Sequence, residues 1–186
     1  MNVRLFLVTL IVPLFTAIAV QGAVEPKSAP REKGVVDFTG AAEWFQKGLE
    51  LNRAGDYREA AEAFRKVIAI TPGDAAAWFN LGTASAFLGN YEEAATSLKQ
   101  TVRLNPEFLP AYGNLGAICY RLGRFREAIE AYGQVLRLKP DDTNARFNRG
   151  MAYYAMGDKD SAWKEYEMLK PLDGELAAKL LEAITR

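Results

Sequence analysis

The stretch AAAWFNLGTASAFLGNYEEAATSLKQTVRLNPEF, residues 75–108, decides the fold because it contains two helix patterns and the breaks that separate them. Its opening part, AAAWFNLGTASAF, repeats apolar and small residues at the spacing of one helix face. The pair Gly89 and Asn90 interrupts this pattern with a turn. A second helix pattern starts at Tyr91, and Pro106 ends it because proline cannot continue the helical hydrogen bonds. The stretch therefore predicts a helix–turn–helix hairpin.

The same hairpin pattern recurs along the chain at a spacing of 34 residues. The residues in register are a helix glycine (Gly48, Gly82, Gly116 and Gly150), a turn glycine (Gly55, Gly89, Gly123 and Gly157) and a helix alanine (Ala60, Ala94, Ala128 and Ala162). A period of this length is typical of stacked helical hairpins, which form an extended surface and not a closed active-site pocket. The pattern predicts an all-α fold, an α-solenoid of four hairpins.

The composition argues against several classes of function. Lys+Arg and Asp+Glu are both 23, so no net field attracts the chain to nucleic acid. The chain has no histidine, which removes the commonest general base and the commonest metal ligand. Its only cysteine, Cys119, is expected to be a buried small apolar residue. We expect no enzymatic activity, no cofactor, no metal site and no nucleic-acid partner.

The N-terminal segment has the features of an export signal. Arg4 precedes an uncharged run at residues 5–20, and small residues follow it. The run is shorter than the roughly 20 residues that a membrane-spanning helix needs. We expect residues 1–22 to be a signal peptide and the protein to be exported to the periplasm, secreted or lumenal. The alternative is a membrane anchor at residues 5–24; in either case residues 23–40 form a linker.

The repeats resemble the tetratricopeptide repeat family, in the register W-x2-L-G-x2-Y, then A-x3-F, then P, over about residues 41–176. The second hairpin carries Trp78, Leu81 and Gly82 at the first three of these positions. The resemblance divides the chain into repeats at residues 41–74, 75–108, 109–142 and 143–172, with a capping helix at 173–186. The fourth repeat is atypical, because Arg146 and Arg149 replace a large aromatic residue and a leucine. The tryptophans Trp44, Trp78 and Trp163 are predicted to be packing residues.

The resemblance also implies a concave groove lined by the first helix of each hairpin. The side chains expected to bind a partner there are Phe45, Leu49, Phe79, Asn80, Phe87, Asn114, Tyr120, Arg121, Phe147, Asn148, Met151 and Tyr154. Large apolar side chains on an open surface usually indicate binding, and aromatic and arginine side chains dominate interface energetics. The lysine and asparagine that chaperone-binding relatives use to hold a C-terminal carboxylate are absent from the fifth and ninth positions.

Two sets of polar side chains leave alternatives open. The sixth positions carry Gln46, Asn80, Asn114 and Asn148. These amides either bind the backbone of an extended peptide or form hydrogen bonds within the array. A second set, Arg121, Arg146 and Arg149, is expected near the third and fourth repeats, where it would form a site for a carboxylate or an acidic segment of a partner. The alternative is that Arg146 and Arg149 are paired with nearby glutamates or solvated.

The function that these features favour is an exported adaptor that holds a segment of another protein in its groove and so assists the assembly of a complex. The alternative is a structural module that associates with copies of itself. A third alternative is a membrane-tethered form of either, in which residues 5–24 are retained.

Overall fold

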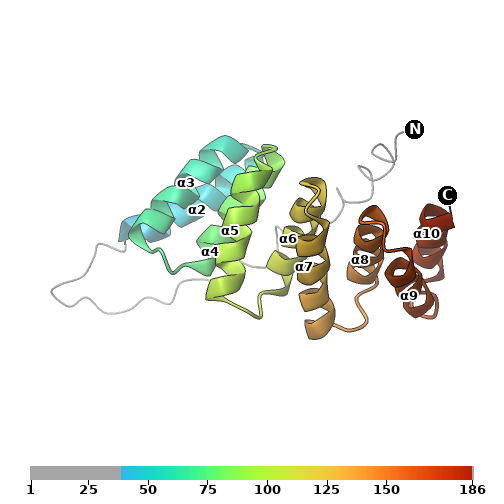
Figure 1. Cartoon of the computed structure of the whole chain (residues 1–186). Helices are drawn as coiled ribbons and strands as arrows, with labels where there is room; N and C mark the ends of the chain where they lie inside the picture. Colours follow the sequence, from blue (N-terminus) through green and yellow to red (C-terminus); the bar gives the residue numbers. More distant parts are fainter. Residues whose placement is uncertain (1–38, 186) are drawn as a thin grey trace. The chain divides into compact units, whose positions relative to one another are not determined.

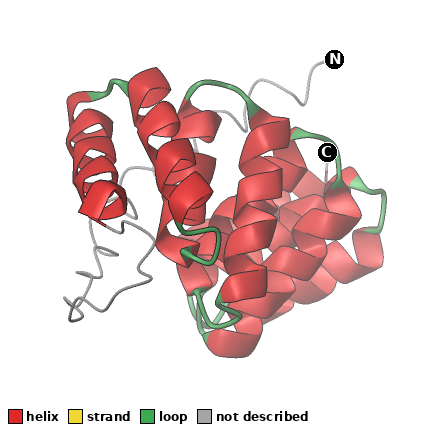
Figure 2. Ribbon diagram, turned by 90° about the vertical axis from the view of Figure 1, so that its left-hand side faces the viewer, coloured by secondary structure: helices red, strands yellow, loops and turns green. Residues whose placement is uncertain are grey.

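The structure is a computed structural model that describes residues 39–185. The predicted signal peptide or anchor, and nearly all of the predicted linker, lie outside the described residues. Within them, every regular element is an α-helix, so the predicted all-α fold is confirmed (Figure 2). None of the helices in this range has the length and apolar composition that crossing a membrane requires.

The described residues form two compact units, and the chain passes from the first to the second between Pro106 and Glu107. In the first unit, consecutive helices pack against each other in chain order (Figure 1). These helices are α2 (Thr39–Ala54), α3 (Tyr57–Ile70), α4 (Ala75–Phe87) and α5 (Tyr91–Leu104). The second unit follows the same pattern, with α6 (Leu109–Arg121), α7 (Phe125–Leu138), α8 (Thr143–Ala155), α9 (Lys159–Leu169) and α10 (Gly174–Thr185). Each unit therefore contains two helical hairpins, and the second also contains one further helix.

The turn glycines are explained by the backbone of the hairpin loops. Gly55, Gly89, Gly123 and Gly157 have φ between +72° and +87°, in the left-handed region. In the loop of the second hairpin, the N–H of Asn90 donates to the carbonyl of Ser85 at 2.8 Å, which satisfies a carbonyl at the end of α4. A residue with a Cβ would be strained at these positions.

The helix glycines are explained by the close approach of neighbouring side chains. A Cβ on Gly116 would lie 2.7 Å from the ring of Tyr132, which is buried between α6 and α7. A Cβ on Gly82 would lie 2.9 Å from Leu98. Glycine therefore makes room for a large side chain where the two helices of a hairpin meet.

Helix α10 is the predicted capping helix, and the structure confirms it. The Asp173 carboxylate accepts a hydrogen bond from the Leu176 N–H at 3.0 Å and so begins the helix. Leu180 and Ile184 are buried, and α10 packs against both α8 and α9. Gly150 provides the space for Leu180, since a Cβ there would lie 2.7 Å from the leucine. The apolar stripe of α10 thus covers the last hairpin.

The packing prediction for the tryptophans is wrong for Trp163. Trp44 and Trp78 are half-buried, and the Trp78 indole N–H donates to the Pro72 carbonyl at 2.9 Å. Trp163 is 46% exposed and contacts the ring of Tyr166 on the same helix, 5.1 Å away between centroids. In the first unit its register position is occupied by the buried alanines Ala61 and Ala95. The capping helix leaves this position of α9 uncovered.

Candidate partner-binding site

The twelve predicted groove residues lie on the first helices of the hairpins, but they differ widely in exposure. Buried are Phe45, Phe79, Asn80, Asn114, Phe147, Asn148 and Met151; half-buried are Leu49, Tyr120, Arg121 and Tyr154; exposed is Phe87. The phenylalanines at the fifth positions are therefore part of the core. Phe45, for example, packs edge-on against Phe64 of α3, with ring centroids 5.7 Å apart. The sequence could not show this burial, because a phenylalanine pattern is the same for a core and for a groove.

In the first unit, α4 carries an exposed phenylalanine and an amide that is already bonded. Phe87 is 37% exposed and stacks on Tyr57 of α3, with centroids 4.3 Å apart and planes 7° from parallel. The Asn80 amide donates to the Ala76 carbonyl of its own helix at 2.8 Å. Gln46, at the equivalent position of α2, is exposed. For Asn80 the structure supports the alternative of a hydrogen bond within the array.

In the second unit, Asn114 on α6 and Asn148 on α8 are recessed without a partner. Their residues are only 3% and 7% exposed, and α6 contacts α8. Neither side chain forms a hydrogen bond to any residue of the described range. The buried polar side-chain atoms without a partner in that range belong to Asn52, Arg146 and Arg149, so the two amides keep some contact with solvent. Recessed, reachable and unpaired amides are suited to binding the N–H and C=O groups of another chain.

Two tyrosines lie further along the same helices. Tyr120 of α6 and Tyr154 of α8 are half-buried, and Tyr120 packs edge-on against Phe125 at 5.3 Å between centroids. Burial raises the pKa of Tyr120 to about 12, and the nearby Tyr154 hydroxyl adds to the effect. Burial also raises the pKa of Tyr132 on α7, and the nearby Tyr120 hydroxyl adds to the effect. Each tyrosine follows its asparagine by six residues, about 9 Å along the helix axis and about 120° around it. The first helices of the second unit thus present amides followed by phenol rings.

Two of the three predicted arginines meet at one carboxylate. In the second unit, Arg149 Nη2 lies 2.7 Å from Glu165 Oε1, and Arg146 Nη1 lies 3.4 Å from Glu165 Oε2. Arg146 also donates from Nη2 to the Pro140 carbonyl at 2.7 Å. The pairing of Arg146 and Arg149 with a nearby glutamate is therefore confirmed.

Arg146 takes over the role of the aromatic residue that it replaces. The Trp78 indole donates to the carbonyl of the proline six residues before it, and the Arg146 guanidinium does the same with Pro140. Both groups are planar donors. The substitution therefore keeps the contact with the preceding loop and adds a buried positive charge.

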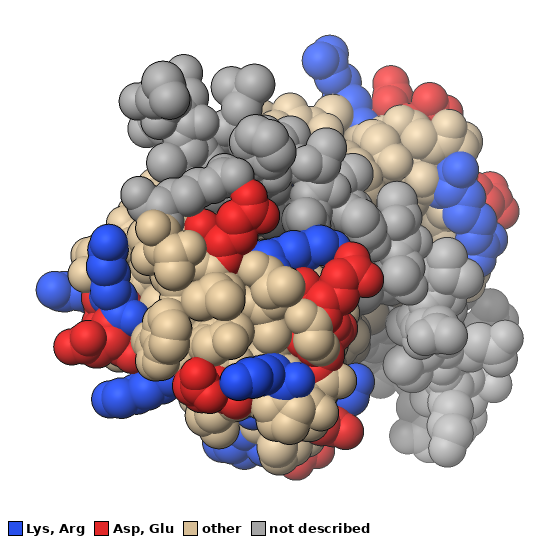
Figure 3. Space-filling model, turned by 90° about the vertical axis from the view of Figure 1, so that its right-hand side faces the viewer, with Lys and Arg blue, Asp and Glu red and all other residues tan. Residues whose placement is uncertain are grey.

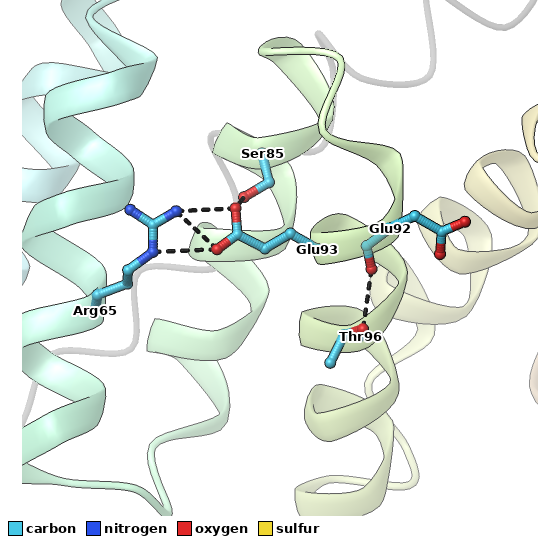
Figure 4. Close-up of polar contacts among 5 residues, drawn as sticks. All are labelled: Arg65, Ser85, Glu92, Glu93 and Thr96. Carbon is cyan, nitrogen blue, oxygen red and sulfur yellow. Dashed lines mark hydrogen bonds and ion pairs between the residues drawn. The ribbon is translucent and has the colours of Figure 1, made fainter.

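Sequence reasoning missed an ion pair between the hairpins of the first unit. Arg65 of α3 donates from Nε and Nη2 to the carboxylate of Glu93 of α5, at 2.7–3.1 Å, and the Ser85 hydroxyl donates to the same carboxylate at 2.8 Å (Figure 4). From the sequence, Glu93 is one of two acidic residues that compensate the dipole at the start of a helix. The backbone carbonyl of its neighbour Glu92 accepts from the Thr96 hydroxyl at 2.9 Å, and the Glu92 carboxylate points away from Arg65 (Figure 4). Only the fold shows which of the two glutamates faces the preceding hairpin.

Charges of both signs alternate over the face that shows the C-terminal helices, around areas of uncharged surface (Figure 3). Residues 39–185 contain no group of three or more acidic, cysteine or histidine side chains arranged to hold a metal ion. Cys119 is fully buried, as expected from the sequence.

Two family models match the sequence. One, described as tetratricopeptide repeat, matches residues 51–119, and one, described as TPR repeat, matches residues 116–157. Together they span more than half of the chain. No curated protein matches the sequence significantly.

Solved structures with the same architecture include several helical-repeat proteins. A crystal structure of MamA is 26% identical, with a TM-score of 0.67 over 78% of this chain and 81% of that chain. MamA from Desulfovibrio magneticus RS-1 is 19% identical, with a TM-score of 0.68 over 78% and 93%, a likeness of fold alone. The first TPR of Spaghetti (RPAP3), bound to the HSP90 peptide SRMEEVD, is 26% identical, with a TM-score of 0.61 over 66% and 97%.

Proposed function

The chain belongs to the tetratricopeptide repeat family, and from this premise we propose that it is a non-enzymatic adaptor that binds an extended segment of a partner protein. We place the binding site on α6 and α8 of the second unit. The proposal is consistent with the repeat domain of Spaghetti, which is similar to this chain and is bound to a peptide in its solved structure.

The observation that carries the proposal is the pair of unpartnered amides, Asn114 and Asn148. Because the two amides keep some contact with solvent, a bound peptide backbone would replace weak hydration, and each hydrogen bond would contribute about 0.5–1.5 kcal/mol net. Because every peptide has the same backbone groups, such a pair binds backbone with little dependence on sequence. The half-buried rings of Tyr120 and Tyr154 add apolar contact area at low cost in conformational entropy.

The mode of binding differs from capture of an acidic C-terminus. The fifth positions of the four hairpins carry Phe45, Phe79, Gly113 and Phe147, and none of these side chains offers a positive charge. We therefore propose that an internal, extended segment is bound, and that a free carboxyl terminus adds nothing to its affinity.

A peptide selected from short random sequences displayed against the full chain provides the probe. We expect Asn114→Ala and Asn148→Ala each to weaken the selected peptide about fivefold, the loss of one net hydrogen bond of about 1 kcal/mol. Backbone N-methylation of the peptide, position by position, should identify the N–H groups that donate hydrogen bonds to the asparagine side chains. A methylated peptide should then bind the wild type and the matching alanine variant equally.

Asn80→Ala is the matched control, because Asn80 belongs to the same set of amides but is bonded to its own helix. It should leave the affinity of the peptide unchanged. If Asn80→Ala weakens the peptide as much as the double variant Asn114→Ala/Asn148→Ala, or if the double variant binds normally, the site is not on α6 and α8.

We also propose that the adaptor is exported, with residues 1–22 removed as a signal peptide. The support is the uncharged run at residues 5–20 behind Arg4. Intact mass of the protein recovered from its host compartment tests this, since cleavage shortens the chain at its N-terminus. A full-length mass in a membrane fraction would instead favour the anchor at residues 5–24.

A further inference from the structure

We propose that Arg149, together with Arg146 and Glu165, forms a binding site for a carboxylate group that approaches over Gly133 of α7. The site is separate from the proposed peptide site, because it uses neither the two asparagines nor the tyrosines. All of its residues belong to the second unit.

The first argument is the balance of charge. Two guanidinium groups share one carboxylate: the side chain of Arg146 is 7% exposed, that of Glu165 is 7% exposed and that of Arg149 is 21% exposed. One positive charge in this cluster is therefore not compensated. A buried charge without a counter-charge is costly, whereas an added carboxylate would complete two ion pairs.

The second argument is the number of unused donors. The Nε atoms of Arg146 and Arg149 are buried and have no hydrogen-bond partner within residues 39–185. Arg146 already uses its Nη atoms on Glu165, the Pro140 carbonyl and the Met168 sulfur. Arg149 has one contact, from Nη2 to Glu165, and its side chain is the more exposed of the two. Since both Nε atoms are buried, the donor of the cluster that a ligand can reach is Nη1 of Arg149.

The third argument is the glycine on the neighbouring helix. A Cβ built on Gly133 of α7 would lie 3.7 Å from Nη1 of Arg149, in ordinary contact. The same register position carries Arg65 and Lys99 in the first unit, both long side chains. Arg65 extends from there to a carboxylate on the next hairpin. At Gly133 there is no side chain to cover Nη1, so the glycine leaves the approach to Arg149 open.

The chemistry favours a carboxylate. A planar guanidinium edge matches a planar carboxylate in a two-point contact, and the single uncompensated charge matches a monoanion. Such a group occurs in the acidic side chains or the C-terminus of a protein and in free organic acids. On α7, Glu130 lies one turn before Gly133 and Arg137 one turn after it, so the ligand would approach from the side of Arg137.

The first test supplies the carboxylate from within the chain. Gly133→Glu places it beside Nη1 of Arg149, and Gly133→Gln is the matched control of the same size without the charge. We expect the Tm of the full-length Gly133→Glu protein to exceed that of Gly133→Gln by about 2–4 °C. The difference should vanish when Arg149→Gln is added. Equal Tm values for the Glu and Gln variants, or a difference that persists with Arg149→Gln, would overturn the proposal.

The second test supplies the carboxylate from solution. A blocked Gly-Glu-Gly tripeptide at about ten times its Kd, compared with Gly-Gln-Gly at equal ionic strength, should raise the Tm of the wild type by about 2 °C and leave that of Arg149→Gln unchanged. Glu130→Gln should increase the response, since it removes the competing negative charge. Acetate distinguishes the sources: an effect as large as that of the tripeptide indicates a site for free acids, and a smaller one a site for a polypeptide. If Gly-Glu-Gly changes the Tm no more than Gly-Gln-Gly does, the proposed carboxylate site is contradicted.

Discussion

Both units contain arginine–glutamate contacts, between two hairpins in the first unit and within one hairpin in the second, and they place these contacts in different surroundings. In the first unit, Arg65 and Glu93 form their pair at the surface, with side chains 46% and 33% exposed. In the second unit, the side chain of Glu165 is 7% exposed and serves two arginines. Exposed pairs contribute about 0–1 kcal/mol, because water competes for both charges. A buried pair contributes little net stability, yet losing one partner leaves an unpaired charge in the interior.

The same comparison holds for the amides at the sixth positions. In the first unit, Asn80 donates to its own helix and Gln46 is exposed. In the second unit, Asn114 and Asn148 are recessed and unpaired within the described range. At the sixth positions the first unit thus has no recessed and unpaired amide, although the buried Oδ1 of Asn52 on α2 has no partner in the described range. The second unit contains both an uncompensated charge and recessed, unused amides. Unsatisfied polar groups of this kind indicate the unit in which binding is to be sought.

The largest effect should follow removal of the shared carboxylate. Glu165→Ala leaves Arg146 and Arg149 without their counter-charge, and we expect the free energy of unfolding to fall by about 3–5 kcal/mol. Chemical denaturation of the full chain measures it. A loss below that of an ordinary surface substitution would mean that water reaches the cluster freely.

A triple variant tests whether the loss expected for Glu165→Ala comes from the missing counter-charge or from poorer packing of α8 against α9. Arg146→Trp, Arg149→Leu and Glu165→Ser each introduce the residue that the second hairpin carries at the same register position. These residues are Trp78, Leu81 and Ser97. Replacing a whole buried ionic network by apolar groups is often neutral or stabilising by about 1–4 kcal/mol. We therefore expect the triple variant to be at least as stable as the wild type. Under the further proposal it should also lose the response to a carboxylate ligand.

The periodicity was sufficient to predict the hairpins, because turn glycines and helix glycines report local backbone and packing requirements. It also identified α10, since the cap at Asp173 and the stripe with Leu180 and Ile184 are local signals. The site was harder to predict. The sequence shows that Asn80, Asn114 and Asn148 share a register position, but equal register does not determine hydrogen bonding.

The partners of the charged residues were equally hidden. That Arg146 and Arg149 share Glu165 depends on how α9 packs against α8, and the gap at Gly133 depends on α7. Such contacts join residues from different hairpin elements, which a pattern of residue types does not bring together. The fold was therefore predictable from local rules, whereas the satisfaction of polar groups was not.

A glycine pair within the second unit should show the next largest difference. Gly116→Ala brings a Cβ to 2.7 Å from the buried ring of Tyr132, so we expect a loss of about 2 kcal/mol from overpacking. Gly133→Ala meets only ordinary contact with Arg149, and the gain in helix propensity should stabilise the protein by about 1 kcal/mol. Thermal unfolding of the two variants checks the contrast. Equal effects would mean that the position of α6 against α7 is looser than described.

The surface pair of the first unit should matter less than its buried counterpart. Glu93→Gln removes the charge opposite Arg65 and keeps the size of the side chain. We expect a loss of about 1 kcal/mol, above that of a simple surface pair because the Ser85 hydroxyl also donates to this carboxylate. Raising the salt concentration should reduce the loss, whereas it should hardly change the effect of Glu165→Ala. Identical salt dependence for the two variants would remove the distinction between the units.

The smallest effect concerns pH and belongs to the second unit. The pKa of Tyr120 is raised from 10.0 to about 12, so the folded protein keeps a proton that the unfolded chain releases in this window. The folded state then binds more protons, and stability must fall as pH rises from about 10 to about 12. Because Tyr120 is partly exposed, we expect its contribution at pH 11 to stay below about 1 kcal/mol. Tyr120→Phe should flatten this part of the pH profile of denaturant unfolding. A profile as steep in Tyr120→Phe as in the wild type would contradict the role of this tyrosine at high pH.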